Sequence, residues 1–297
     1  LGIKTGSFFK RTILGIALRD LQIPLSSELT SESEILLRRG IKDRLTALAP
    51  FLSWDSDPYA AIVNNNVVWI VDGYTTSNSY PYSQSFGREG LPSGSDIARI
   101  PLNYMRSAVR AVIDADTGTT TLYESDIEQS TDPILTLWKK VLPDLIEPAD
   151  SMSQELRAHL RYPKDLFIVQ SSLLGRYHVS DAESLFNGQD RWTISPAPGA
   201  DVGMPGYAVS QPVFRFNTVA GKSQWSMIRT YNTGSSSNVS AGRDVLSAMI
   251  IASNDSPQKL QVIRLNSSDG NKISSPQVAQ SAIDADPELA RIITLLN

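Results

Sequence analysis

Residues 59–71 read Tyr59-Ala60-Ala61-Ile62-Val63-Asn64-Asn65-Asn66-Val67-Val68-Trp69-Ile70-Val71. Two runs rich in β-branched and aromatic residues flank three asparagines, which tolerate the positive φ angles of a tight turn. The pattern predicts a β-hairpin with strands at 59–63 and 67–71. A two-residue turn at Asn64 and Asn65 pairs Val63 with Asn66.

The same pattern occurs twice more along the chain. Residues 108–113 and 119–123 flank Asp116-Thr117-Gly118, and residues 245–252 and 260–265 flank a turn at 254–257. Three hairpins favour an antiparallel sheet, because parallel strands need long crossover connections. The predicted fold class is therefore α+β, with an antiparallel sheet built from hairpins.

Helices are expected in a block of their own between the second and third hairpins. Asp132-Pro133, Ser153 and Pro163 are each typical of a helix start, and Asp286-Pro287 predicts a C-terminal helix. Ser31 and Glu34 have the spacing of a capping box, which predicts a further helix through Leu48. Segregated helices and strands complete the α+β assignment.

An amphipathic helix is expected near the N-terminus, over residues 6–19. Its apolar and basic positions are Phe8, Phe9, Ile13, Leu14, Ile16, Leu18, Lys10, Arg11 and Arg19. The favoured interpretation is that the apolar stripe packs on the core. The alternative is a helix that lies along a membrane surface.

The amino-acid composition indicates a globular protein and argues against several classes of partner and metal site. The 297 residues are 41% hydrophobic and 20% charged, which is typical of a globular protein. We expect one composite domain, which can have two lobes. The first lobe, 1–130, contains the first two hairpins, and the second, 131–297, contains the helical block and the third hairpin. The net charge of −4 argues against a nucleic-acid partner. Zero cysteines exclude disulfides and cysteine-ligated zinc. Because the chain starts at Leu1, we expect a piece of a larger protein.

The first candidate functional site is a metal-binding site in the first hairpin. If the first hairpin continues without interruption, Asp57 lies opposite Asp72, with Asp55 opposite Tyr74 and Cβ atoms ~5 Å apart. Two carboxylates at that distance need a cation or a shared proton. Asp55, Asp57 and Asp72 are therefore candidate ligands for Ca²⁺ or Mg²⁺. The alternative is a shifted register, in which these residues cap turns and strand ends.

Two further groups of residues are candidate ligand-binding sites. Arg157, His159 and Arg161 are expected on one helix, where two guanidinium groups can grip a phosphate or a carboxylate. The alternative is ion pairing with nearby acids. Tyr74, Tyr80 and Tyr82 belong to an aromatic segment that suits sugar stacking or a protein interface. That segment can instead seal the edge of the sheet.

Several unusual blocks of sequence carry a resemblance to a known family. They are Gly6–Phe9, Trp54–Tyr59, Trp69–Gln84, Leu156–Pro163 and Asp284–Glu288. The chain resembles the uncharacterised protein family numbered 0182, whose members are large multi-pass bacterial membrane proteins. The resemblance implies membrane-spanning helices N-terminal to a soluble region outside the cytoplasmic membrane. It implies no catalytic residue.

Three functions follow as expectations. The first is a non-enzymatic extracytoplasmic domain of a membrane protein that binds a protein partner or a cell-envelope ligand, since no catalytic motif is complete. The second is a divalent-metal-dependent enzyme acting on envelope material, with Asp55, Asp57 and Asp72 as ligands and His159 as acid or base. The third is a scaffold that holds subunits together as an oligomer.

Overall fold

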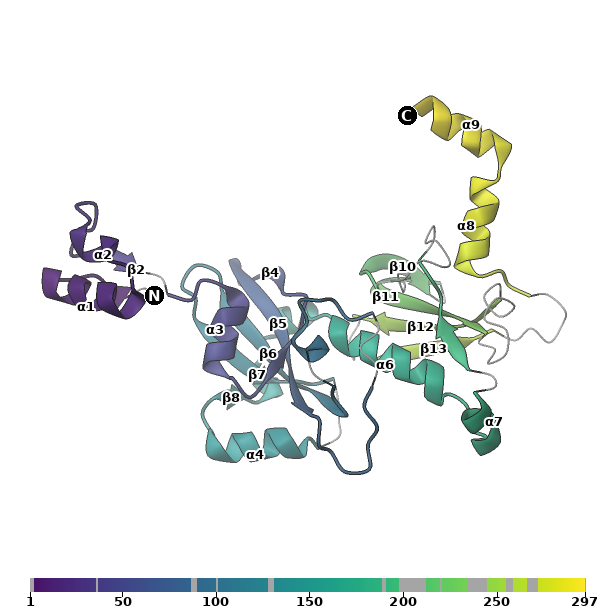
Figure 1. The fold of residues 1–297 in the computed structure, drawn as a ribbon, viewed down its shortest axis with the longest axis horizontal. Coiled ribbons are helices and arrows are strands. Elements are labelled where there is room, and N and C mark those ends of the chain that lie inside the picture. Colours follow the sequence, from purple (N-terminus) through teal and green to yellow (C-terminus); the bar gives the residue numbers. More distant parts are fainter. Residues whose placement is uncertain are drawn as a thin grey trace.

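The computed structural model describes residues 3–35, 37–86, 90–99, 101–127, 131–188, 191–197, 212–219, 221–233, 245–254, 259–265 and 272–296. Within these ranges the chain forms helices and three sheets whose strands are mostly antiparallel, which confirms the α+β class. Two larger sheets lie side by side, and an N-terminal unit and the C-terminal helices extend from them (Figure 1).

The first large sheet contains the first two predicted hairpins. Its strands are β3 (Ser53–Trp54), β4 (Tyr59–Val63), β5 (Asn66–Ser77), β6 (Tyr104–Asp114), β7 (Thr120–Glu124) and β8 (Ile146–Glu147). The strand order is β3-β5-β6-β7-β8, and β4 also pairs with β5. Val63 pairs with Asn66, and Asn64 and Asn65 have φ angles of 49° and 65°. The hairpin and its two-residue turn are therefore confirmed.

The second large sheet contains the third predicted hairpin, β12 with β13. Its strands are β9 (Trp192–Ile194), β10 (Arg215–Val219), β11 (Lys222–Thr233), β12 (Leu246–Ser253) and β13 (Leu260–Arg264). The order is β10-β11-β12-β13, with β9 also on β11. The second hairpin, β6 with β7, and the third are both confirmed by their antiparallel pairing.

The predicted block of helices lies in sequence between β7 and the second large sheet. They are α4 (Pro133–Val141), α5 (Gln154–Ala158), α6 (Lys164–Tyr177) and α7 (Ala182–Asn187). The predicted caps of α4 and α5 are present, because Asp132 accepts from the backbone of Ile134 and Leu135, and Ser153 accepts from that of Leu156.

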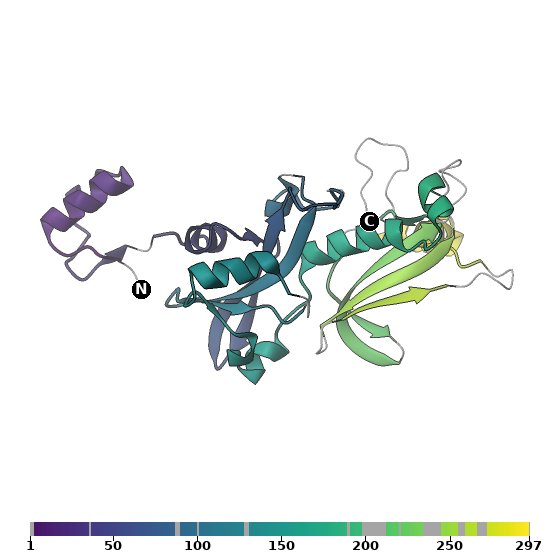
Figure 2. The same cartoon turned by 90° about the horizontal axis from the view of Figure 1, so that it is seen from below.

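Helix α6 contacts both large sheets. Asp165 at its start accepts hydrogen bonds from Ser56 beside the first sheet, and the carbonyl of Ser171 accepts a 2.6 Å bond from the hydroxyl of Tyr231 in the second. In Figure 2 the helix runs from the first sheet onto the second. It therefore belongs to both halves of the molecule.

The N-terminal residues form a small unit, β1 (Ile3–Lys4), α1 (Phe8–Leu18), α2 (Gln22–Leu25) and β2 (Glu34–Ile35). The helix predicted from Ser31 is wrong, since Glu34 pairs with Lys4 across β1 and β2, and α3 (Ile41–Leu48) begins later. Thr5 reinforces this pairing by donating to backbone oxygens at 30 and 33. A long-range contact therefore overrides the local capping signal.

The favoured packing of the N-terminal helix on the core is also wrong. In both views the purple α1 lies apart from the two large sheets (Figures 1 and 2). Gly15 is its one buried residue, and Phe8, Phe9, Ile13, Ile16 and Leu18 are exposed. The apolar face of α1 therefore has no cover within the described residues.

The C-terminal helices are α8 (Pro276–Asp284) and α9 (Pro287–Leu296). The start of α9 confirms the helix predicted from Asp286-Pro287, and the backbone N–H groups of Glu288 and Leu289 donate to the Asp286 carboxylate. Across the described residues, every helix falls short of the length and apolar content that a bilayer crossing requires.

Candidate functional site

The register around the predicted metal site differs from the uninterrupted hairpin. Trp54 pairs with Gly73 and Tyr59 pairs with Ile70, so the chain advances five residues while β5 advances three. The two extra residues shift the pairing, and the backbone N–H of Asp55 donates to the carbonyl of Asp72 at 2.9 Å. The prediction that Asp57 lies opposite Asp72 is therefore wrong.

A buried cluster of carboxyl groups occupies this part of the sheet. One oxygen of Asp55 accepts hydrogen bonds from the Tyr74 hydroxyl and from the backbone N–H of Asp165. Its other oxygen accepts a 2.8 Å bond from the backbone N–H of Asp57. Asp165 accepts from the hydroxyls of Ser56 and Ser95, each at 2.6 Å. The cluster ties the start of α6 to the first sheet.

Burial governs the proton affinity of these groups. Removal from water, together with the charges of Asp165 and Asp72, raises the pKa of Asp55 to about 8. Burial also raises the pKa of Asp165. For Asp72, burial raises the pKa to about 6 although Arg110 opposes the rise. Asp55 and Asp165 are sealed from solvent, so the cluster is a structural element of the interior.

Asp72 forms an ion pair with Arg110. The guanidinium Nη1 lies 2.8 Å from Asp72 Oδ1, and both side chains are almost completely buried. Nη1 also donates to the carbonyl of Arg161 at 3.1 Å, and Nε lies 3.5 Å from the half-exposed Asp126. Asp72 is therefore the principal counter-charge of a buried arginine.

The Ca²⁺ or Mg²⁺ site at Asp55, Asp57 and Asp72 stays a prediction. Asp55 and Asp72 are 2% and 4% exposed, and their oxygens already have protein partners. In the part of the chain that the structure describes, no three His, Cys, Asp or Glu side chains gather as a metal ion would require. The arrangement of these aspartates is explained by hydrogen bonds within the protein.

The predicted helical face of Arg157, His159 and Arg161 does not form. Helix α5 ends at Ala158, and the chain leaves it before Pro163. Arg157 donates to the carbonyls of Ala149 and Met152, and Arg161 stacks on Tyr59 at 4.4 Å from the ring centre. The two guanidinium groups therefore serve different contacts, and ligand binding by these residues stays a prediction.

The predicted aromatic segment separates into a buried part and an exposed part. Tyr74 lies in β5 with no exposed surface. Tyr80 and Tyr82, at 42% and 110% exposure, lie beyond the end of that strand. Tyr80 stacks on Tyr104 of β6, with 4.7 Å between ring centres. Tyr80 and Tyr82 are therefore available to a ligand, whereas Tyr74 belongs to the core.

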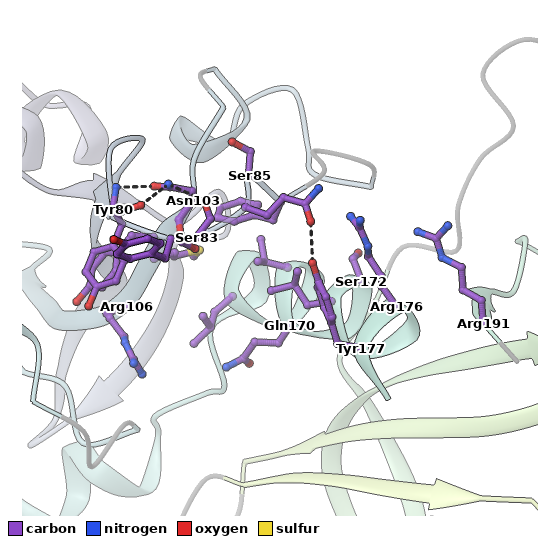
Figure 3. A pocket seen from close by; sticks show the side chains of 18 residues that line it. Tyr80, Ser83, Ser85, Asn103, Arg106, Gln170, Ser172, Arg176, Tyr177 and Arg191 are labelled. Carbon is purple, nitrogen blue, oxygen red and sulfur yellow. Dashed lines mark hydrogen bonds between the residues drawn. The ribbon is translucent and has the colours of Figure 1, made fainter. Parts of the chain in front are cut away.

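A pocket of about 810 Å³ opens between residues 80–86, strand β6 and helix α6 (Figure 3). Asn103 holds its loop in place, because its side-chain amide donates to the carbonyls of Tyr80 and Ser83 at 2.9 and 3.1 Å. The hydroxyl of Tyr177 in α6 donates to Gln84 at 2.9 Å and so joins the two walls. These bonds preorganise the pocket.

The lining of the pocket is positively charged and aromatic. Among the described residues that line it are three arginines, Arg106, Arg176 and Arg191, and no aspartate or glutamate. Tyr80, Tyr82, Tyr104 and Tyr177 also line it. Figure 3 shows Arg176 and Arg191 near one end and the Tyr80 segment at the other. The arrangement suits a ligand that has a ring at one end and a negative charge at the other.

The sequence identified only part of this pocket. Tyr80 and Tyr82 were predicted ligand residues, and both line it. The three arginines come from β6, from α6 and from the residue before β9. No local pattern joins these positions, because the tertiary fold alone brings them together. One weak signal was available, the direct succession of Arg176 and Tyr177.

Comparison with known proteins finds a family model and curated relatives that carry the same family name. The model of the uncharacterised protein family UPF0182 matches residues 1–296. A UPF0182 protein of Frankia casuarinae is 36% identical over 99% of this chain and 28% of the relative. One of Mycobacterium tuberculosis is 35% identical over 99% and 29%. The chain thus spans less than a third of these curated relatives. No solved structure matches it.

Proposed function

Because this chain belongs to UPF0182, a family without an established function, we propose from its own geometry that it binds a sugar carrying a phosphate or carboxylate group in the pocket beside α6. One observation carries the proposal, which is that the lining side chains described by the structure include three arginines and no acid. Guanidinium groups bind phosphate and carboxylate oxygens through paired hydrogen bonds.

The size and walls of the pocket support a ligand with a ring. A volume of about 810 Å³ lies within the usual range for small-molecule sites. Tyrosine rings offer apolar faces for stacking, with a hydroxyl that can hydrogen-bond to a sugar. The proposal is binding of such a ligand without chemical conversion.

Calorimetric titration of the chain with glucose 1-phosphate and with glucuronate tests this proposal. At least one of these anions should bind more tightly than both glucose and inorganic phosphate, because ring and charge contact different walls. Arg176→Ala and Arg191→Ala should each weaken that binding about tenfold or more, which is the loss of one charge-assisted contact.

Arg39→Ala is the matched control, since it removes an exposed arginine that does not line the pocket. It should leave the affinity unchanged. If neither anion binds at millimolar concentration, or if both pocket variants bind as tightly as the parent, the proposal is wrong.

We further propose that the pocket lies on the extracytoplasmic side of the cell membrane, where anionic sugars of the envelope are available. The resemblance to membrane proteins supports this location, and the ligand chemistry of the pocket is compatible with it. The proposal concerns the longer protein, of which this chain matches one part.

Thiol labelling in intact cells tests the location, because this chain contains no cysteine of its own. Glu183→Cys adds an exposed thiol on α7. In the whole protein, with any cysteines elsewhere replaced, a membrane-impermeant maleimide should label this thiol before lysis. Labelling that appears only after lysis contradicts the extracytoplasmic location.

A further inference from the structure

The N-terminal helix presents a continuous apolar face to solvent. Phe9, Ile13 and Ile16 follow one another at i, i+4 and i+7, the spacing that places side chains on one side of a helix. They are 75%, 51% and 68% exposed, and the neighbouring Phe8 is 67% exposed. Leu21, directly before α2, and Leu25, its last residue, are 70% and 80% exposed. Large apolar side chains with this much exposure point to an interaction surface.

The opposite side of α1 is fixed by contact with α2. A Cβ atom at Gly15 would lie 2.7 Å from the Pro24 ring and 2.9 Å from the carbonyl of Asp20, so only glycine permits this approach. The backbone N–H of Asp20 donates to the carbonyl of Gly15 at 2.9 Å. The unit thus packs inward through glycine, and the bulky side chains remain on its outer side.

The charged residues of α1 are basic, and the first acidic residue of the chain, Asp20, directly follows Arg19. Lys10, Arg11 and Arg19 lie in or directly after α1, and no acidic residue occurs between Ile3 and Arg19. The chain as a whole carries a net charge of −4, so this segment differs from the rest of the molecule. A basic rim beside an apolar face complements a surface that is apolar inside and negatively charged outside.

We propose that α1 and α2 bind the surface of a lipid bilayer that contains anionic lipids. The helix lies in the plane of the interface, with Phe9, Ile13 and Ile16 among the acyl chains, and Lys10 and Arg19 near the headgroup phosphates. With 11 residues, α1 is too short to cross the bilayer. This inference is independent of the ligand pocket.

A second copy of the chain fits this face less well. Two such faces in contact would bring the basic residues of both copies together, and like charges across an interface oppose association. A lipid surface instead supplies the opposite charge together with an apolar layer.

Vesicle flotation with the 297-residue chain tests the inference. The chain should float with vesicles of phosphatidylcholine mixed with phosphatidylglycerol, and much less with phosphatidylcholine alone. Phe9→Ser/Ile16→Ser should reduce the bound fraction about tenfold or more, because it removes apolar insertion. Lys10→Gln/Arg19→Gln should reduce binding to the anionic vesicles about tenfold, because each basic residue near such a surface contributes to affinity.

Ile62→Ser is the matched control, since Ile62 is an apolar residue of β4 with 62% exposure. It should float like the parent, and all variants should keep the parent melting temperature because the altered side chains are exposed. Two results overturn the inference. One is absence of flotation with either vesicle, and the other is a lipid-free dimer that Phe9→Ser/Ile16→Ser dissociates in light scattering.

Discussion

Arg110→Met should lower the free energy of unfolding by about 3 kcal/mol or more at pH 8, because it leaves the ionised Asp72 buried without its principal counter-charge. Arg110 has no exposed surface, and its shortest ion-pair contact, 2.8 Å, is to Asp72. Methionine is unbranched and fills much of the space of the arginine stem, so the loss mainly reports charge and not a cavity. Urea denaturation followed by tryptophan fluorescence measures it.

Two further variants make this result specific. Glu124→Gln removes the partner of Lys139 in an ion pair of 2.7 Å whose side chains are 36% and 38% exposed. This change should cost less than about 1 kcal/mol, because solvent screens exposed pairs. Replacement of both Asp72 and Arg110 by leucine should restore much of the loss, since neither member of the buried pair is then left charged without the other. Equal losses for the buried and the exposed pair would contradict the argument.

The stability of the protein should fall as the pH rises from about 5 to 8. The native pKa of Asp55 is about 8 and that of Asp72 about 6, against a reference value of 3.8. The native state therefore holds protons that the unfolded state has already released. Each such proton lowers the free energy of unfolding by about 1.4 kcal/mol per pH unit. The stabilisation from the protonated aspartates is complete at pH values below the unfolded-state pKa. It is lost progressively as the pH rises to and through the native-state pKa.

Asp55→Asn should flatten this dependence above pH 6, because Asp72 is then largely ionised while Asp55, beside Asp165, is still losing its proton. Melting temperatures at intervals of pH provide the measurement. Asp114→Asn is the control, because the turn residue Asp114 has a pKa below its usual value, lowered by hydrogen bonds from Thr117. That control should retain the parent slope between pH 6 and 8. An unchanged slope in Asp55→Asn would show that other groups control the pH dependence.

The elements that could be predicted from sequence are those whose signals are local. Asn64 and Asn65 adopt positive φ angles in the predicted turn, and Asp132 caps the predicted helix. Ser31 and Glu34 carried an equally clear signal, yet pairing of Glu34 with Lys4 decided the structure there. Local preference of a few tenths to about 1 kcal/mol per residue is readily outweighed by tertiary contacts.

The candidate site was less predictable because it depends on register and on distant parts of the chain. Two extra residues between β3 and β4 moved Asp55, and not Asp57, beside Asp72. Arg106 and Arg191 lie on different elements and reach one pocket only in the folded chain. Tyr80 and Tyr82 could be identified from the sequence because a polar segment with several aromatic residues is unusual in a loop between two strands.

Helix α6 forms buried hydrogen bonds with both halves of the molecule, and this links their folding. Its first turn completes the hydrogen bonding of Asp55 in one half of the molecule, and its later turns receive Arg229 and Tyr231 from the other. Loss of either half would strip this helix of buried partners and expose Phe167 and Ile168. We therefore expect the two sheets to unfold as one cooperative unit, in which neither melts while the other keeps its full native stability.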